Sequence, residues 1–593
     1  MEPALDASGS DLSVEQATAL LVGPPFFHIL SGRSVESIDT RRLAEEFTRV
    51  LAARRRQNRG ATAGRDARSR AGLSNVAYVA SGEGGRMTWS DRAPEIRTAS
   101  GVVRGRWRDG VAVFLGVPYA RPPVGDLHLA GPVPASPWDG VRDADAFGPA
   151  PPQSLAVGYG TGRQTVAGAD DWLTVNVFSP DPGAAGLAVM VWIYGGMYMI
   201  GSADGPGYDG AALARRNTVL VTFNHRVGAE GYGQFADAPP NRALLDQIAA
   251  LEWVRENIAA FGGDPDRVTV FGESAGAGAV AALMATPRAA GLFHRAVAQS
   301  VPGTFYSLPL AADIGTAVAA ELGLAPTRAA LAPVAPDALR DAADAVLNSM
   351  ADHGKRWGRA ARVRMPFAPV VDGDLLPCTP WEALRAGQSA GIELVVGHTR
   401  DECRGFTALS GRRGKVTEEE AAALLEWCAP DAAGARAYRT GHPDANPTDL
   451  QDLVLSDWLF RMPSLHLADA HTAGGGTAYL YEMAWPSPAM DGALGACHGL
   501  DVPLVFGNHG GEIGELLLGK EPSPEATALS AAMMAAWTDF AGTGTPGWAP
   551  YRPEDRLTRV FNAESATVPY PEEISRRIWA DWSFAALEPT GGG

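Results

Sequence analysis

Cysteine is scarce in this sequence of 593 residues, which contains only Cys378, Cys403, Cys428 and Cys497. These four form no C-x-x-C pair and lack the density of a disulfide-rich domain, so the fold need not depend on disulfide bonds. Acidic residues and no early apolar segment follow Met1, so no secretory signal is visible. We therefore expect a cytoplasmic protein.

Basic residues are also in deficit. The chain has 50 Lys and Arg against 67 Asp and Glu, a formal net charge of −17. This balance opposes binding to phosphate backbones and anionic lipid surfaces, so we expect no nucleic-acid partner. A hydrophobic content of 46% with 20% charged residues is typical of a folded globular protein that buries a sizeable core.

No segment has the pattern of a membrane-spanning helix. Residues 182–203 carry no charge and are long enough to cross a bilayer. However, Gly195, Gly196 and Gly201 interrupt the segment, and its dense apolar part, residues 187–193, has the length of a buried strand. The sequence therefore predicts no membrane span.

Residues 1–92 differ in pattern from the rest of the chain. Ser13 and Gln16 could form a capping box, and apolar residues recur at helical spacing over 43–51. Arginines interleaved with Gly, Ala and Ser follow over 54–70, which favours a flexible linker over a patch that binds an anionic partner. We expect an N-terminal extension over 1–92, a catalytic domain over 93–585 and a disordered tail over 586–593.

Within 93–585, short β-type runs alternate with helical segments such as residues 243–259, and no repeat is evident. The runs cover residues 96–107, 111–115, 188–193, 218–223, 268–271 and 393–396. This order predicts an α/β fold with a mostly parallel sheet covered by helices on both faces. In such sheets, reactive groups lie at the carboxyl ends of the strands.

The pattern G-x-S-x-G, typical of a nucleophile elbow, occurs twice, around Ser274 and around Ser389. The elbow requires a strand before the serine and a helix after it. Residues 267–271 and 275–285 give Ser274 this order. Ser389 has the reverse order, a helix over 380–386 and a strand over 392–396, so it is better explained as part of a helix end and connector.

A serine hydroxyl needs a base to activate it and an acid to orient that base. In α/β-hydrolases the acid and then the histidine follow the serine along the chain. Among the histidines after Ser274, His498 lies in a Gly-rich loop, and His398 is its nearest rival. Asp401 and Glu402 both follow the predicted strand at 393–396, and the pattern alone does not choose between them.

These residues belong to a set of motifs, spread from about residue 97 to 551, that resembles the type B carboxylesterase family. The motifs are FLGVPYARPPVG at 114–125, NHRVG at 224–228, LDQ at 245–247, FGGDP at 261–265, DE at 401–402 and HG at 498–499. The resemblance implies the α/β-hydrolase fold with large helical insertions, and a catalytic triad of Ser274, Glu402 and His498. It favours Glu402 over Asp401.

By the same resemblance, the segment at 194–198 is the oxyanion loop, and the backbone N–H groups of Gly196, Met197 and Ala275 form the oxyanion hole. Many relatives carry a glycine where this chain has Met197. The larger side chain there leads to the hypothesis that esters of bulky tertiary alcohols are poor substrates. A second departure is that Pro151, Pro152 and Trp172 stand near the positions where secreted relatives place a cysteine pair.

The sequence thus predicts a carboxylic-ester hydrolase that acts on a small-molecule ester through an acyl-enzyme and needs no metal or organic cofactor. The same triad could serve an amide, carbamate or thioester hydrolase or an acyltransferase. A non-catalytic, cholinesterase-like binding protein is the alternative from another class, which the presence of all three triad residues disfavours. We expect Glu273, inside the elbow, to be a buried, hydrogen-bonded structural carboxylate that points away from Ser274.

Overall fold

The computed structural model describes residues 93–157, 170–205 and 207–590. The chain divides into two units, residues 1–92 and 93–593. The predicted helix and arginine-rich linker of the first unit lie outside the described residues.

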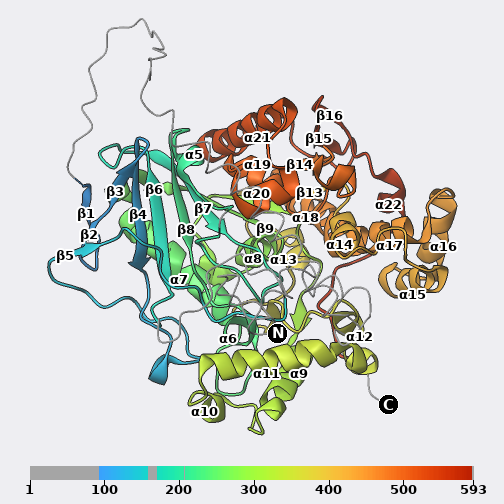
Figure 1. The fold of residues 1–593 in the computed structure, drawn as a ribbon, viewed down its shortest axis with the longest axis horizontal. Coiled ribbons are helices and arrows are strands. Elements are labelled where there is room, and N and C mark those ends of the chain that lie inside the picture. Colours follow the sequence, from blue (N-terminus) through green and yellow to red (C-terminus); the bar gives the residue numbers. More distant parts are fainter. Residues whose placement is uncertain (1–92, 158–169, 206, 591–593) are drawn as a thin grey trace, which may run out of the picture. The chain divides into compact units, whose positions relative to one another are not determined.

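The second unit is built on an eleven-stranded sheet with the order β16-β15-β14-β13-β10-β9-β7-β8-β6-β4-β3 (Figure 1). The strands from β15 to β8 in this order pair in parallel, and the pairs toward both edges are antiparallel. The strand bounds are β3 Arg106–Arg108, β4 Val111–Pro118, β6 Thr174–Ser179, β7 Leu187–Ile193, β8 Thr218–Phe223, β9 Gly263–Glu273, β10 Arg295–Gln299, β13 Glu393–Thr399, β14 Ala478–Met483, β15 Leu557–Phe561 and β16 Ala566–Pro569. The predicted parallel centre is therefore confirmed.

The central strands are apolar along nearly their whole length because both of their faces are buried. In β7, alternate residues Ala188, Met190 and Trp192 pack in one hydrophobic cluster with Trp537 of α21 (Pro524–Thr543). The intervening residues of β7 point to the opposite face, because side chains alternate along a strand. The apolar run at 187–193, predicted to be a buried strand, is therefore β7. No helix in the described ranges is long and apolar enough to span a bilayer.

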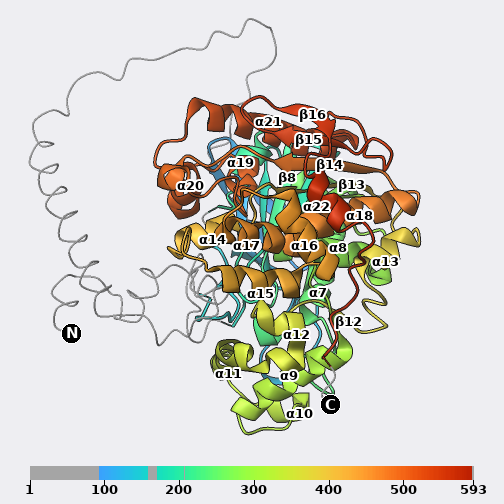
Figure 2. The same cartoon turned by 90° about the vertical axis from the view of Figure 1, so that its right-hand side faces the viewer.

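Helices cover both faces of the sheet. α7 (Arg242–Asn257) and α8 (Ala275–Met284) pack against β9 on one face, and α21 packs with α19 (Asp501–Phe506) on the other. In Figure 1 the first pair is green and the second is orange to red. The helical insertions are also present. α9 (Leu308–Glu321), α11 (Pro336–Ser349) and α12 (Gly354–Arg362) gather at one end of this unit in both Figure 1 and Figure 2.

Two expectations need correction, one at the start of the second unit and one at its end. The predicted run at 96–107 is split into β1 (Glu95–Arg97), β2 (Val102–Arg104) and β3, and β1 and β2 join β5 (Val141–Asp143) in a separate three-stranded sheet. The prediction of a disordered tail over 586–593 is wrong for 586–590. The Leu587 N–H donates to the Phe305 carbonyl at 2.7 Å, and the Thr590 N–H to that of Arg356 at 3.0 Å. Local sequence could not indicate this order, because the pairing partners are distant in the chain. Residues 591–593 lie outside the described ranges.

Candidate active site

Ser274 sits at a sharp turn between the last residue of β9 and the first residue of α8. Its backbone has φ 58° and ψ −125°, a strained conformation for a residue with a side chain, as a nucleophile elbow requires. The turn also needs small neighbours. A Cβ on Gly276 would lie 2.0 Å from the Ile193 carbonyl oxygen, and one on Gly272 would lie 2.6 Å from the Gly276 backbone. The predicted order of strand, turn and helix is therefore present.

Ser389, the serine of the second G-x-S-x-G pattern, follows α13 (Pro380–Arg385) and precedes β13. Its hydroxyl donates a hydrogen bond to the Met284 carbonyl at 2.6 Å. Gly387 has φ 86° and its N–H bonds the Leu384 carbonyl at 2.9 Å, as at a helix end. Ser389 thus ties a connector to the end of α8, as the sequence suggested.

Glu402 and His498 are in direct contact. The Oε2 atom of Glu402 lies 2.5 Å from Nδ1 of His498, and the His498 backbone N–H donates to the Glu402 carbonyl at 3.1 Å. The other carboxylate oxygen of Glu402 accepts from the Ser300 hydroxyl at 2.6 Å and from the Thr399 N–H at 2.9 Å. The buried carboxylate is therefore held on both oxygens and fixes one nitrogen of the imidazole.

The two rival residues face elsewhere. Asp401 accepts a hydrogen bond from the Ala496 N–H at 2.9 Å, so it shapes the loop that carries His498 without touching the imidazole. His398 is buried, with Nε2 3.0 Å from the Tyr570 hydroxyl and Nδ1 3.0 Å from the Thr399 carbonyl. Of the alternatives that the pattern left open, the structure brings together Glu402 and His498.

Glu273 is buried, as expected, but the expectation that it points away from Ser274 is wrong. Its Oε1 atom lies 3.2 Å from Nε2 of His498. A Cβ placed on Gly195 would lie 3.1 Å from both the Glu273 carboxylate and the Ser274 Cβ, so these two consecutive side chains border the same space. Side chains alternate only while the strand continues, and the positive φ at Ser274 breaks the alternation.

The Ser274 hydroxyl forms no hydrogen bond with any residue in the described ranges, and Nε2 of His498 faces the Glu273 carboxylate. Glu273 therefore connects the two residues: it directly precedes Ser274 in the chain, and its carboxylate contacts the His498 imidazole.

The predicted oxyanion loop has an unusual backbone. Gly196, Met197 and Tyr198 follow one another with φ of 118°, 57° and 61°, and the N–H groups of Met199 and Ile200 both bond the Gly196 carbonyl at 3.0 Å. A Cβ on Gly196 would lie 2.4 Å from the Ile200 carbonyl oxygen, so only glycine fits there.

Three N–H groups are candidates for binding an anion here. In the part of the chain that the structure describes, the amides of Gly196 and Met197 donate to no protein acceptor. Ala275 begins α8, where an N–H has no acceptor within its own helix. The loop carrying the first two approaches the elbow at Gly195, which borders the Ser274 side chain.

Comparison with known proteins places this geometry in a family. Residues 92–568 match the model of the carboxylesterase family. The para-nitrobenzyl esterase of Bacillus subtilis is 35% identical, with 81% of this chain and 97% of that protein covered. The liver carboxylesterase of Sus scrofa is 33% identical, with 83% and 94% covered. A solved carboxylesterase of Geobacillus stearothermophilus superimposes with a TM-score of 0.71 at 33% identity, over 82% of this chain and 99% of that one.

The chain belongs to the carboxylesterase family. It is a carboxylic-ester hydrolase with the α/β-hydrolase fold, so the predicted fold, family and enzyme class are confirmed. All four cysteines of this carboxylesterase are free.

Carboxylates on both sides of the imidazole set the electrostatics of this carboxylesterase's site. Burial opposes a charged imidazolium, but Glu273 and Glu402 outweigh it and raise the pKa of His498 to about 9. Burial also raises the pKa of Glu273, against the opposing effect of His498. In Glu402 burial is outweighed by His498 and by the Ser300 hydrogen bond, so its pKa is lowered and it stays ionised.

Sequence reasoning missed Ser300, which is fully buried and bonds the Glu402 carboxylate. A signal for it exists, because Ser300 directly follows β10, at the carboxyl edge of the sheet where reactive groups gather. Its φ of 59° marks it as a second constrained serine beside the elbow.

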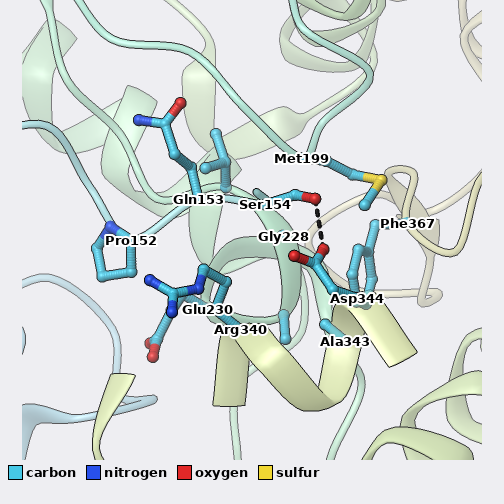
Figure 3. A pocket seen from close by; sticks show the side chains of 12 residues that line it. Pro152, Gln153, Ser154, Met199, Gly228, Glu230, Arg340, Ala343, Asp344 and Phe367 are labelled. Atoms are coloured by element: carbon cyan, nitrogen blue, oxygen red, sulfur yellow. Dashed lines mark hydrogen bonds between the residues drawn. The ribbon is translucent and has the colours of Figure 1, made fainter. Parts of the chain in front are cut away.

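A small hollow lies beside the oxyanion loop (Figure 3). Met199, directly after that loop, lines it together with Ser154 and Asp344 of α11. The Asp344 carboxylate accepts hydrogen bonds from the Ser154 hydroxyl and from the Leu155 N–H, the latter at 2.9 Å. The Ser154 N–H bonds the Met199 carbonyl at 3.1 Å. The Asp344 carboxylate thus ties the segment near Pro152 to α11, and the Ser154 N–H ties it to Met199, directly after the oxyanion loop.

Proposed function

We propose that this enzyme hydrolyses small-molecule carboxylic esters through Ser274, His498 and Glu402 and passes through an acyl-enzyme. The observation that carries the proposal is the 2.5 Å contact between Glu402 Oε2 and His498 Nδ1. It leaves Nε2 facing the space that the elbow serine borders.

In the proposed reaction, His498 accepts the proton of the Ser274 hydroxyl as its oxygen attacks the ester carbonyl carbon. The tetrahedral intermediate collapses when His498 gives that proton to the departing alcohol, which leaves Ser274 acylated. Water then attacks the acyl group with the same proton transfers and releases the acid. Glu402 fixes the imidazole tautomer and stabilises the imidazolium without taking the proton.

We further propose that the N–H groups of Gly196, Met197 and Ala275 hold the oxygen that becomes negative in the tetrahedral intermediate. The free amides of the first two and the helix start at the third support this role. Such a donor typically contributes about 3 kcal/mol to transition-state stabilisation. The chemistry requires only groups of the chain, the ester and water.

A substitution series tests the mechanism. Ser274→Ala should lower kcat on p-nitrophenyl esters by about 10⁴-fold or more, while Ser389→Ala, in the other G-x-S-x-G pattern, should keep wild-type activity. A serine-directed phosphonate should label the wild type and leave the Ser274→Ala variant unlabelled. Full activity in the Ser274→Ala variant would rule the mechanism out.

The cytoplasmic location and the lack of a nucleic-acid partner stay predictions.

A further inference from the structure

The His498 imidazole is held by an aromatic ring as well as by carboxylates. The Phe460 ring stacks on it with centroids 4.2 Å apart and planes 30° apart. The Phe406 ring lies at 5.7 Å and is tilted by 60°. Phe460 is only 6% exposed, so its ring is fixed by the core around it. The contact with Glu402 holds one edge of the imidazole, and the stacked ring limits tilting out of its plane.

A widened helical turn places Phe460 there. A π-helical segment, η6 (Asp457–Arg461), lies between α17 (Pro447–Ser456) and α18 (Met462–Ala473). Pro463, four residues after Leu459, has no N–H to donate to the Leu459 carbonyl, which accepts instead from the Gly303 N–H at 2.9 Å. Such turns often occur at functional sites, because the extra residue redirects side chains.

The π-helical segment η6 is also hydrogen-bonded to the turn that carries Glu402. Arg461 donates to the Arg400 carbonyl at 3.1 Å, two residues before Glu402, and to the Glu572 carboxylate at 2.7 Å. Its guanidinium forms an ion pair with Asp457 at 3.0 Å. One short segment therefore contacts both the imidazole and the turn that presents its carboxylate partner.

We propose that Phe460 is a positioning residue for His498. Its ring keeps the imidazole in the plane in which Nδ1 binds Glu402 and Nε2 faces the space bordered by Ser274. The electron-rich face of the ring also stabilises the imidazolium that forms at each proton transfer. This role rests on the proposed function, because it matters only if His498 transfers protons.

The charged groups around His498 come from three other elements, and the test must keep them unchanged. Glu273 ends β9, Glu402 follows β13 and Asp501 begins α19, and all three favour the imidazolium. Phe460 carries no charge, so replacing it alters the stacking contact and leaves these carboxylates in place.

Two variants of the full-length enzyme separate the effect of the aromatic ring from the effect of an apolar side chain at this position. Phe460→Leu keeps an apolar side chain without a π face, and Phe460→Tyr keeps the ring. We expect Phe460→Leu to lower kcat by about tenfold to a hundredfold, because a misplaced base transfers protons slowly. The KM for a short p-nitrophenyl ester should stay within about twofold. Phe460→Tyr should recover most of the lost kcat.

The matched control is Phe305→Leu, which also removes a buried ring, one that packs against Trp381. It should cost stability without the selective loss of kcat. If Phe460→Leu keeps wild-type kcat, or if Phe305→Leu reproduces its loss, the positioning role is wrong. Thermal unfolding of each variant shows whether it is folded under the assay conditions.

A readout that needs no turnover separates this proposal from the proposed function. In the Ser274→Ala background, titration of the His498 imidazole by NMR should show its pKa about half a unit lower once Phe460 is replaced by leucine. An unchanged imidazole pKa would overturn the stabilising role of the ring. Full esterase activity of Ser274→Ala would instead overturn the proposed function.

Discussion

Nε2 of His498 lies 3.2 Å from Oε1 of Glu273, the residue immediately before the proposed nucleophile. Nδ1 of the same ring contacts Glu402 at 2.5 Å, so the imidazole has a carboxylate at each nitrogen. Only one of these carboxylates occupies the side from which a serine proton must arrive. In the proposed mechanism Glu402 orients the base, whereas Glu273 faces the nitrogen that would accept the serine proton and favours the charged form of the imidazole.

This arrangement predicts a pH dependence. The pKa of His498 is raised to about 9, and a base must be neutral, so kcat/KM should increase from pH 7 toward pH 9. Burial raises the pKa of Glu273 to about 8, so this carboxyl becomes an anion beside Nε2 over the same pH range. Glu273→Gln removes that charge, which should lower the imidazole pKa and move the acidic limb of the profile to lower pH. Profiles of kcat/KM for a neutral ester measure the shift.

The control for that shift is Glu564→Gln, which neutralises an exposed glutamate in the turn between β15 and β16. It should leave the profile unchanged. A Glu273→Gln profile that coincides with that of the wild type would mean that Glu273 does not influence the base.

Ser300 supplies a second prediction. Its buried hydroxyl bonds the Glu402 carboxylate at 2.6 Å, and a hydrogen bond to a charged group typically contributes about 1.5 to 3 kcal/mol. Ser300→Ala should lower kcat by about tenfold, because the carboxylate loses one of its fixed contacts. Ser300→Thr, which keeps the hydroxyl, should retain more activity. Steady-state kinetics with equal kcat for Ser300→Ala and wild type would contradict this.

Met197 leads to a third prediction. It holds φ 57° in the oxyanion loop, a conformation that costs a residue with a side chain about 1 kcal/mol or more, and it is partly exposed beside the proposed anion site. Met197→Gly should relieve the strain and make room for branched alcohols. We expect the rate on a tert-butyl ester, relative to its n-butyl isomer, to increase by about tenfold.

The wild-type enzyme should turn over the tert-butyl ester more slowly than the n-butyl ester, and the reverse order would refute the hypothesis about bulky alcohols. Met199→Ala is the control for Met197→Gly. It shortens a methionine directly after the same loop, one that lines the neighbouring hollow, and it should leave the ratio of the two rates unchanged.

Local sequence was enough wherever neighbours in the chain define the structure. The apolar run of β7 can be buried only between two covering layers, so it predicts a central strand. The strand-like run at 267–271, the glycines around Ser274 and the helical run at 275–285 predict an elbow, because this sharp turn needs neighbours without a side chain. The context of Ser389, a helix before and a strand after, excluded the second G-x-S-x-G pattern on the same local grounds.

Contacts between distant segments were beyond local patterns. Asp401 and Glu402 are adjacent and chemically alike, and the residue pattern left both open until the resemblance favoured Glu402. In the fold, Asp401 binds the backbone of the histidine loop and Glu402 binds the ring. The side chain of Glu273 was placed on the wrong side, because strand alternation was extended one residue into a turn that ends it.

The sequence by itself determined the elbow, the buried strands and the order of the reactive groups, because backbone sterics and hydrophobic burial act on consecutive residues. Only the tertiary structure decided which carboxylate meets each nitrogen of His498, that Ser300 and Phe460 hold this assembly, and that residues 586–590 are ordered. Those outcomes depend on distances between segments far apart in the chain, which are set only when the sheet and its helices have packed.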